Sequence, residues 1–378
     1  MDQDLEKWFD FFELIIQIKI AVMKITNFNK LLFFLILLFT VSACKKEEAP
    51  PPVTGSGEWL IPVEQVLSGG PGPDGIPSVD SPQFEKASEV TYLEDNDLVL
   101  GIKMGDIIRA YPHPILDWHE IINDVIDGKA VAITYCPLTG TGIAWDANIN
   151  GSNTTFGVSG LLYNSNLMPF DRTSNSLWSQ MRLDCVNGTL ISEVVETIPL
   201  VETTWKTWKA LYPNSDVVTT STGFNRDYDD YPYGNYKTEN SLNFPISKED
   251  NRLHKKERVL GVIVGNTVRT YRFNSFATER INIITDELAG EDLIIIGSDE
   301  DQILMAYKNK LTDGTVLDFT AVQDGGIIIA EDADGNKLNV FGEIVDGPHK
   351  NKNLEHVSTY LGYWFSWGTF YNPSIYGQ

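Results

Sequence analysis

One short stretch of the sequence brings together a histidine, a carboxylate and a cysteine. Residues 117–146 read DWHEIINDVIDGKAVAITYCPLTGTGIAWD and contain His119, Glu120 and Cys136. A thiolate is a nucleophile and a soft metal ligand, and a nearby imidazolium lowers the pKa of a thiol. We therefore expect the chemistry of this protein to centre on Cys136 and His119, with Glu120 as a further catalytic candidate.

Cys136 ends an apolar run, residues 130–136, that predicts a buried strand. Pro137 follows it, and because proline lacks an amide N–H it commonly ends a strand. The sulfur is then expected where a loop opens, a place that suits a nucleophile or a metal ligand. Two structural roles compete with this reading: a disulfide with Cys185, which an oxidising compartment would favour, and a small buried apolar side chain.

His119 and Glu120 fall in a predicted short helix, Pro114 to Asn123. Neighbouring helical side chains diverge by about 100°, so only one of the two can face the site. We expect this residue to be His119, with a hydrogen-bonded core histidine as the alternative. His113, between two prolines, is assigned no role, and no histidine has the spacing of an H-E-x-x-H metal site.

Polar and aromatic residues in neighbouring motifs are expected to complete the site. Asp171 opens the stretch DRTSNSLWSQ and is a fourth catalytic candidate; its alternative role is to cap a turn and pair with Arg172. Groups of this kind orient a histidine or a substrate. The predicted substrate-binding residues are Asn123, Thr139, Thr141, Tyr163, Asn164 and Trp178.

An internal repeat organises the elements that must position these residues. Residues 99–111, VLGIKMGDIIRAY, align without gaps on residues 259–271, VLGVIVGNTVRTY, at an offset of 160 residues. Each copy alternates apolar and polar residues around a Gly-Asp or Gly-Asn turn and predicts a β-hairpin. At this offset the positions of the His-Glu pair and of the cysteine hold Glu279, Arg280 and Ile296, so the chemistry is expected in the first copy alone.

The sequence predicts an α+β protein, predominantly antiparallel β, with two pseudo-repeated lobes that arose by internal duplication. The lobes are expected at residues 59–240 and 241–378, packed as one unit, because no Pro/Gly/Ser-rich linker separates them. Trp205 to Tyr212 predicts a helix capped by Thr203 or Thr204. The tryptophan-rich C-terminal stretch is expected in the core, with a platform for glycans as the alternative.

The N-terminal segment predicts export and lipid anchoring. Residues 23–43 combine two lysines, a short apolar run and small residues before Cys44, a pattern typical of a lipoprotein signal peptide that is cleaved before an acylated cysteine. Residues 1–22 are too acidic for such a signal, so translation is expected to start at Met23; an amphipathic helix before an internal anchor is the alternative. Residues 44–58 join the acylated cysteine to a Pro- and Gly-rich run and predict a flexible tether.

Charged residues bear on location and partners. Lys46 is followed by two glutamates, which resembles the signal that sends some lipoproteins to the outer face of the outer membrane; such charges would equally keep a tether solvated. We expect a lipoprotein of the bacterial outer membrane, anchored in the cell envelope through Cys44. The net charge of -23, from 29 basic and 52 acidic residues, disfavours nucleic acid as a partner.

Eight long motifs stand out after the tether. They are WLIP (59–62), GGPGPDGIPSVDSPQF (69–84), RAYP (109–112), WHEIIND (118–124), TYCPLTGT (134–141), FGVSGLLYNSNL (156–167), DRTSNSLWSQ (171–180) and YWFSWGTFYNP (363–373). Together they resemble the DUF3179 family, whose function is unknown. The resemblance implies an exported bacterial or archaeal protein with its distinctive motif at Cys136. Many family members carry C-P-L-C where this chain has Thr139, so an obligatory C-x-x-C dithiol is not implied here.

Three classes of function remain open at the level of sequence. Cys136 and His119 could serve a thiol-dependent enzyme or redox protein, or they could hold copper or zinc with a third ligand. The third class is a surface module that binds a small molecule or glycan and whose cysteine is structural. No cofactor is assigned, and enzymatic activity is left open. In the first two classes the sulfur and the imidazole are expected within reach of each other, in a cleft that both lobes wall.

Overall fold

Strands dominate the computed structural model, which describes residues 57–378. The predicted signal peptide, the lipidation site at Cys44 and the tether up to residue 56 lie outside the described residues. Within residues 57–378, no helix combines the length and the apolar character needed to cross a membrane.

Residues 57–218 form three larger sheets and a two-stranded ribbon. The strands are β1 Val66–Ser68, β2 Phe84–Lys86, β3 Leu98–Met104, β4 Ile107–Pro112, β5 Ile121–Ile126, β6 Lys129–Cys136, β7 Thr141–Asp146, β8 Asn148–Ile149, β9 Ser152–Asn153, β10 Phe156–Tyr163, β11 Asn166–Asp171, β12 Leu177–Ser179, β13 Asp184–Asn187, β14 Thr197–Ile198, β15 Val201–Thr204 and β16 Asp216–Val218. The sheet orders are β1-β10-β11-β12-β13, β14-β7-β6-β5 and β15-β3-β4-β16-β2, and β8 pairs with β9.

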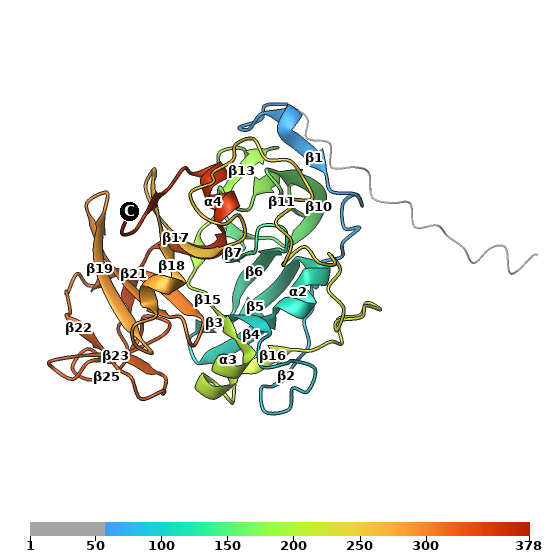
Figure 1. Ribbon diagram of the computed structural model, residues 1–378. Helices are drawn as coiled ribbons and strands as arrows, with labels where there is room; N and C mark the ends of the chain where they lie inside the picture. The colour runs from blue at the N-terminus through green and yellow to red at the C-terminus, as the bar shows by residue number, and fades with distance from the viewer. Residues whose placement is uncertain (1–56) are drawn as a thin grey trace, which may run out of the picture. The chain divides into compact units, whose positions relative to one another are not determined.

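Residues 258–378 form three four-stranded sheets. The strands are β17 Arg258–Val264, β18 Thr267–Arg272, β19 Asn282–Leu288, β20 Glu291–Ser298, β21 Ile303–Leu311, β22 Phe319–Ala321, β23 Ile328–Asp332, β24 Lys337–Asn339, β25 Ile344–Asp346, β26 Leu354–His356, β27 Ser358–Tyr363 and β28 Ser374–Ile375. The sheet orders are β27-β17-β18-β28, β19-β20-β21-β26 and β22-β23-β24-β25. In Figure 1 the orange strands β19 and β22 to β25 gather on the side of the view away from β10, β11 and β13.

Both hairpins expected from the repeated sequence are present. β3 pairs with β4, and β17 pairs with β18, in the same register at an offset of 160 residues. Each hairpin is flanked by an antiparallel strand on one side, β15 or β27, and by a parallel strand on the other, β16 or β28. These two parallel pairs are the exceptions among the described strands, so the prediction of a mostly antiparallel β protein with few helices is confirmed.

The helices are short. They are α2 His113–His119, α3 Trp205–Leu211 and α4 Trp364–Phe370, and the 3-10 turns are η1 Val63–Gln65 and η2 Phe273–Phe276. The predicted α3 and its cap are confirmed, since the Thr204 side chain accepts a hydrogen bond from the Thr207 amide. The helix predicted from Pro114 to Asn123 is too long: Glu120 adopts a left-handed conformation with φ 57°, which ends α2, and the β-branched residues beyond it form β5.

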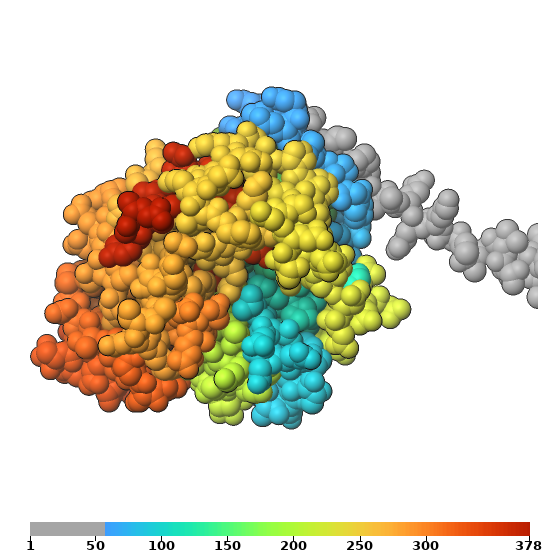
Figure 2. All heavy atoms as spheres, viewed as in Figure 1, coloured from blue at the N-terminus to red at the C-terminus, as the bar shows by residue number. Residues whose placement is uncertain are grey.

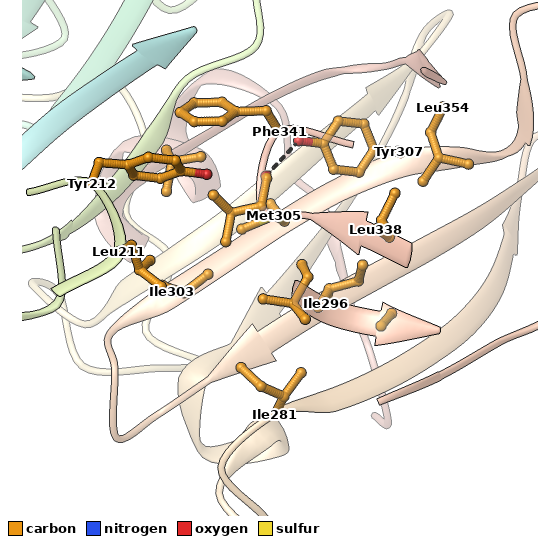
Figure 3. Packing of buried hydrophobic residues seen from close by; sticks show 14 of the residues in the cluster. Leu211, Tyr212, Ile281, Ile296, Ile303, Met305, Tyr307, Leu338, Phe341 and Leu354 are labelled. Carbon is orange, nitrogen blue, oxygen red and sulfur yellow. Dashed lines mark hydrogen bonds between the residues drawn. The ribbon is translucent and has the colours of Figure 1, made fainter. Parts of the chain in front are cut away.

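One of the two large core clusters joins the end of α3 to strands of residues 258–378. Figure 3 shows Leu211 and Tyr212 next to Met305 and Phe341. The Tyr212 and Phe341 rings lie 5.5 Å apart between centroids, and the Tyr307 hydroxyl donates to the Val340 carbonyl at 2.8 Å. Apolar burial therefore holds the early and late parts of the described chain together.

α3 and α4 each press a tryptophan onto a glycine of the neighbouring hairpin. A Cβ atom at Gly101 would lie 1.9 Å from the Trp208 ring, and one at Gly261 would lie 2.2 Å from the Trp367 ring. Neither glycine has a positive φ, so the close approach of the indole, and not backbone freedom, requires glycine at these positions.

We expect Gly101→Ala to lower the free energy of unfolding by about 1–3 kcal/mol, because the added methyl group overpacks the contact with Trp208. Urea denaturation measures the change. Gly72→Ala is the matched control, since a Cβ at Gly72 meets no atom within 4 Å. Equal stability of the two variants would contradict the tight indole contact.

Candidate functional site

An irregular segment, residues 219–257, runs from β16 to β17 and crosses α2; we call it the strap. It contains no helix or strand, and Figure 2 shows it in yellow, exposed along one face next to the orange of the later strands. It binds four consecutive residues at the end of α2. The bonds are Lys237 Nζ to Asp117 Oδ2 (2.9 Å), Trp118 Nε1 to the Asp230 carbonyl (2.9 Å), Tyr228 Oη with His119 Nε2 (2.7 Å) and Tyr233 Oη to Glu120 Oε1 (2.7 Å). The D-W-H-E motif is thus the attachment point of the strap.

His119 is a hydrogen-bonded core histidine. Its Nδ1 lies 2.7 Å from the Pro77 carbonyl, its Nε2 lies 2.7 Å from the Tyr228 hydroxyl, and its ring packs 5.3 Å from that of Phe224. Burial lowers its pKa, which favours the neutral ring. Both ring nitrogens therefore have hydrogen-bond partners within the protein, and a role of His119 as a base for Cys136 or as a metal ligand stays a prediction.

Glu120 is the ionisable group whose charge acts on Cys136. It is 6% exposed, and burial raises its pKa to about 7, although the hydrogen bond from Tyr233 lowers this pKa. The prediction that only one of the pair faces the site assumed that both are helical, whereas Glu120 is the left-handed residue that ends α2. Of the two residues, Glu120 is the one whose charge affects the pKa of Cys136.

Cys136 is a buried thiol without a disulfide. Its side chain is 1% exposed, and Cys185 is also free and buried, so the disulfide alternative is excluded. The sulfur accepts from the Leu167 amide at 3.4 Å and donates to the Ser165 carbonyl at 3.7 Å. Burial, and then the charge of Glu120, raises its pKa to about 11. At neutral pH the group is an un-ionised thiol, which is a poor nucleophile and a poor metal ligand.

The predicted binding residues Thr139 and Thr141 belong to a buried hydrogen-bond network. Their hydroxyls lie 2.8 Å apart, and Asn166 Nδ2 donates to Thr139 at 3.0 Å. Gln180 accepts from Thr141 at 2.7 Å and donates to Thr134 at 3.0 Å. These bonds fix the C-P-L-T-G-T loop between two sheets and leave neither threonine hydroxyl for a substrate.

The remaining predicted site residues also make contacts within the protein. Asp171 is fully buried and accepts bonds from Ser174 and Trp178, so it caps a turn; Arg172 pairs with Asp74 and Asp80 instead of Asp171. The other contacts are Asn123 to Asp80 and to the Phe156 backbone, the Asn164 side chain to the Ser247 amide, Trp178 to Trp145 and Phe156 rings, and Tyr163 to Phe370. They organise the loops and core around β10 and β11 without forming a site.

A pocket of about 340 Å³ lies beside the C-P-L-T-G-T loop; we call it the polar pocket. Gly140 of the loop is in its wall, while Cys136 and His119 are not. Its lining comes from the start of β3, α2, β6, β15, the strap, β17 and β27. The lining residues are Asn96, Asp97, Leu98, His113, Pro114, Asp117, Tyr135, Gly140, Glu202, Lys237, Lys256, Arg258 and Tyr363.

Three buried acceptor atoms in the polar pocket have no hydrogen-bond partner. They are His113 Nε2, Asp117 Oδ1 and Glu202 Oε2, on side chains from residues that are each 4% exposed. His113 Nε2 and Glu202 Oε2 are 3.9 Å apart, too far for a hydrogen bond. The second oxygen of each carboxylate is held by a cation, Lys237 for Asp117 and Arg258 for Glu202. The free oxygens of both carboxylates are therefore fixed in place.

Burial shifts the ionisation of these groups toward their neutral forms. It lowers the pKa of His113 well below the usual value, with Lys237 and Arg258 adding to the effect. It raises the pKa of Asp117 to about 6 against the attraction of Lys237, and it raises that of Glu202 against Arg258. Clustered shifts of this kind in a pocket are typical of functional sites.

A wider pocket of about 680 Å³ adjoins the polar pocket; we call it the outer pocket. The two share Asp97, Pro114, Asp117 and Lys237. The outer pocket adds further carboxylates and aromatic rings from the strap and the segment before β3. These include Tyr92, Glu94, Tyr228, Asp229, Asp230 and Tyr231.

Sequence reasoning missed the polar pocket, although one signal was available. His113 and Asp117 are four residues apart on α2, a spacing that puts two side chains on one helical face. Glu202 and Arg258 lie on strands β15 and β17, and nothing in the local sequence pairs them. Within residues 57–378, no group of three or more His, Cys, Asp or Glu side chains is arranged to hold a metal ion.

The fold and the pocket define a predominantly antiparallel β protein with a buried polar pocket. The chain belongs to the DUF3179 family, described as "Protein of unknown function (DUF3179)", whose profile matches residues 73–374. The resemblance seen in the sequence motifs is thus confirmed. Neither a curated protein nor a solved structure matches the chain.

We expect alkylation of Cys136 in a Cys44→Ser protein to be slow at neutral pH, because the thiolate is scarce and buried. Its rate should rise about tenfold per pH unit up to about pH 9 without a plateau, since the pKa is raised to about 11. The rate is followed by mass spectrometry with iodoacetamide, and Cys136→Ala identifies the modified site. A plateau at or below the ordinary thiol value of about 8.5 would restore the activated-thiol hypothesis.

Proposed function

We propose that the protein is a cell-envelope lipoprotein that binds a small polar ligand in the polar pocket, with Cys136 in a structural role. The proposal rests on the three unpartnered acceptor atoms of His113, Asp117 and Glu202. A buried polar group without a hydrogen bond costs about 1–3 kcal/mol. A pocket that keeps three such groups is best explained by a ligand that supplies the missing donors.

The position and size of the polar pocket support the proposal. Its volume of about 340 Å³ suits a small molecule. Glu202 and His113 come from the first predicted lobe, and Arg258 and Tyr363 come from the second. Ligand pockets commonly form at such junctions, because two packed bodies leave a concave space between them.

The other two hypotheses for function have less support. A thiol enzyme needs an ionised, accessible sulfur, whereas Cys136 is buried and its pKa is raised. A copper or zinc site at Cys136 and His119 needs free donor atoms, whereas both His119 nitrogens are hydrogen-bonded within the protein.

We also infer that the two lobes arose by internal duplication. Support comes from the matched register of the two hairpins, their equivalent flanking strands and the glycine-tryptophan contact in each. In each hairpin an arginine and a tyrosine of the second strand both bind one aspartate of the next hairpin, Asp124 in the first lobe and Asp286 in the second. The repeated detail favours a common origin of the two lobes over a coincidence of pattern.

We expect His113→Phe to leave the free energy of unfolding unchanged or to raise it by up to about 1 kcal/mol, because the ring makes no hydrogen bond within the described residues and its Nε2 is buried without a partner. His119→Phe is the matched control: it removes two hydrogen bonds and should lower stability by about 1–3 kcal/mol. Urea denaturation of the ligand-free protein measures both. If His113→Phe were as destabilising as His119→Phe, the His113 imidazole would be structural and the proposed site would lose its main support.

For the lipid anchor, we expect Cys44→Ser to move the protein from the membrane fraction to the soluble fraction, because the acylated residue is lost. Cell fractionation with immunoblotting measures the distribution. Cys185→Ser is a control that should stay in the membrane fraction. Retention of Cys44→Ser in the membrane would instead favour an internal anchor.

A further inference from the structure

We infer that the polar pocket binds the primary ammonium group of an organic amine. This inference rests on the ligand-binding function proposed above and names the chemical class of its ligand. It follows from the number and kind of unpartnered atoms, from the state of the resident cations and from the charge of the outer pocket.

The unpartnered atoms match the donors of an ammonium group. His113 Nε2, Asp117 Oδ1 and Glu202 Oε2 are three acceptors when the imidazole is neutral with its proton on Nδ1. A primary ammonium carries three N–H donors and no acceptor. It therefore carries one donor for each of the three atoms, and its bonds to the carboxylates are charge-assisted.

The cations of the polar pocket are already engaged and do not supply these donors. Lys237 binds Asp117 Oδ2, and Arg258 binds Glu202 Oε1 and Gln302. Lys256 donates to the backbone carbonyls of Tyr236 and Glu239. Lys237 and Arg258 each bind one oxygen of a carboxylate and leave its other oxygen without a partner.

The charge and the aromatic rings around the entrance favour a cation. Together the two pockets are lined by six carboxylates, namely Glu94, Asp97, Asp117, Glu202, Asp229 and Asp230, against the three cations Lys237, Lys256 and Arg258. Such an excess raises the local concentration of positively charged molecules. The Tyr231 ring already attracts a cation, since Lys237 Nζ lies 4.0 Å from its centroid.

Other ligand classes fit less well. An anion would face three acceptors without donors, and a neutral alcohol supplies one donor, which is too few for three acceptors. An ammonium group can reach the pocket on a free amine or on an aminated phosphate headgroup. The acidic outer pocket opposes the phosphate, so we assign a free amine, in particular a diamine whose second ammonium lies near Asp229 and Asp230.

Isothermal titration of the purified, delipidated protein with four probes tests the assignment. n-Butylammonium has the charge and three donors, butyltrimethylammonium has the charge alone, and n-butanol has a donor alone. Cadaverine adds a second ammonium. We expect cadaverine to bind most tightly, n-butylammonium to bind next, and the other two to bind at least tenfold more weakly. Phosphoethanolamine, which carries the phosphate, should bind more weakly than n-butylammonium.

Two pocket variants and one surface variant complete the test. Glu202→Gln and His113→Phe should each weaken n-butylammonium binding by about 10- to 100-fold, as expected for loss of one charge-assisted hydrogen bond. If Glu202→Gln fails to fold, binding by His113→Phe still tests the site. Asp292→Asn, at an exposed position on β20, should bind like the unmodified protein.

Different results would reject the ammonium assignment and the proposed ligand-binding function. Tighter binding of n-butanol or butyltrimethylammonium than of n-butylammonium would reject the ammonium assignment while keeping a ligand pocket. Equal amine binding by His113→Phe and the unmodified protein would reject this location for the ammonium. No binding of any probe, together with equal destabilisation by His113→Phe and His119→Phe, would reject the proposed function itself.

Discussion

The ion pair between Asp117 and Lys237 joins α2 to the strap, and the pocket wall depends on it. Asp117 is buried and Lys237 is partly exposed, so the lysine brings its charge to a carboxylate that burial alone would neutralise. The same aspartate presents its other oxygen to the polar pocket. One side chain thus fixes an irregular segment of 39 residues, 219–257, and also contributes to the candidate site.

The three hydrogen bonds that follow along the chain extend this attachment. Trp118, His119 and Glu120 each bind the strap through a different group, and Glu120 does so from a left-handed residue that ends α2. In a strand or a longer helix, successive side chains would point to different faces of the element. A single segment on one side could then not contact all of them. The short helix, its abrupt end and the strap are therefore parts of one arrangement.

The parts of the fold that depend on local pattern were predictable, and the site was not. Alternation around a Gly-Asp turn specified the first hairpin, and the Thr204 cap specified the start of α3. The end of α2 was misplaced because Glu120 adopts a positive φ, and sequence gives little warning of such a residue. Glu202 and Arg258 meet only through tertiary pairing of distant strands.

The C-P-L-T-G-T motif illustrates why a distinctive sequence need not mark a reactive group. Thr139 lies in a network that needs side chains able both to donate and to accept, and a threonine hydroxyl meets this need. Cys136 packs behind the loop, and Gly140 brings the loop against the Tyr363 ring, where a Cβ would lie 3.0 Å away. The motif therefore shapes one wall of the polar pocket.

The paired strands at the pocket carry a consequence for how such a site can evolve. Arg258 faces Tyr363 across β17 and β27, and Leu98 faces Thr204 at the matching place across β3 and β15. Two identical subunits related by symmetry would have to present the same residues on both sides. Within one chain, by contrast, each side can change independently. One wall of the pocket can then carry an arginine and the other a leucine. The two ends of a ligand therefore meet different side chains, which a symmetric pair of subunits could not provide.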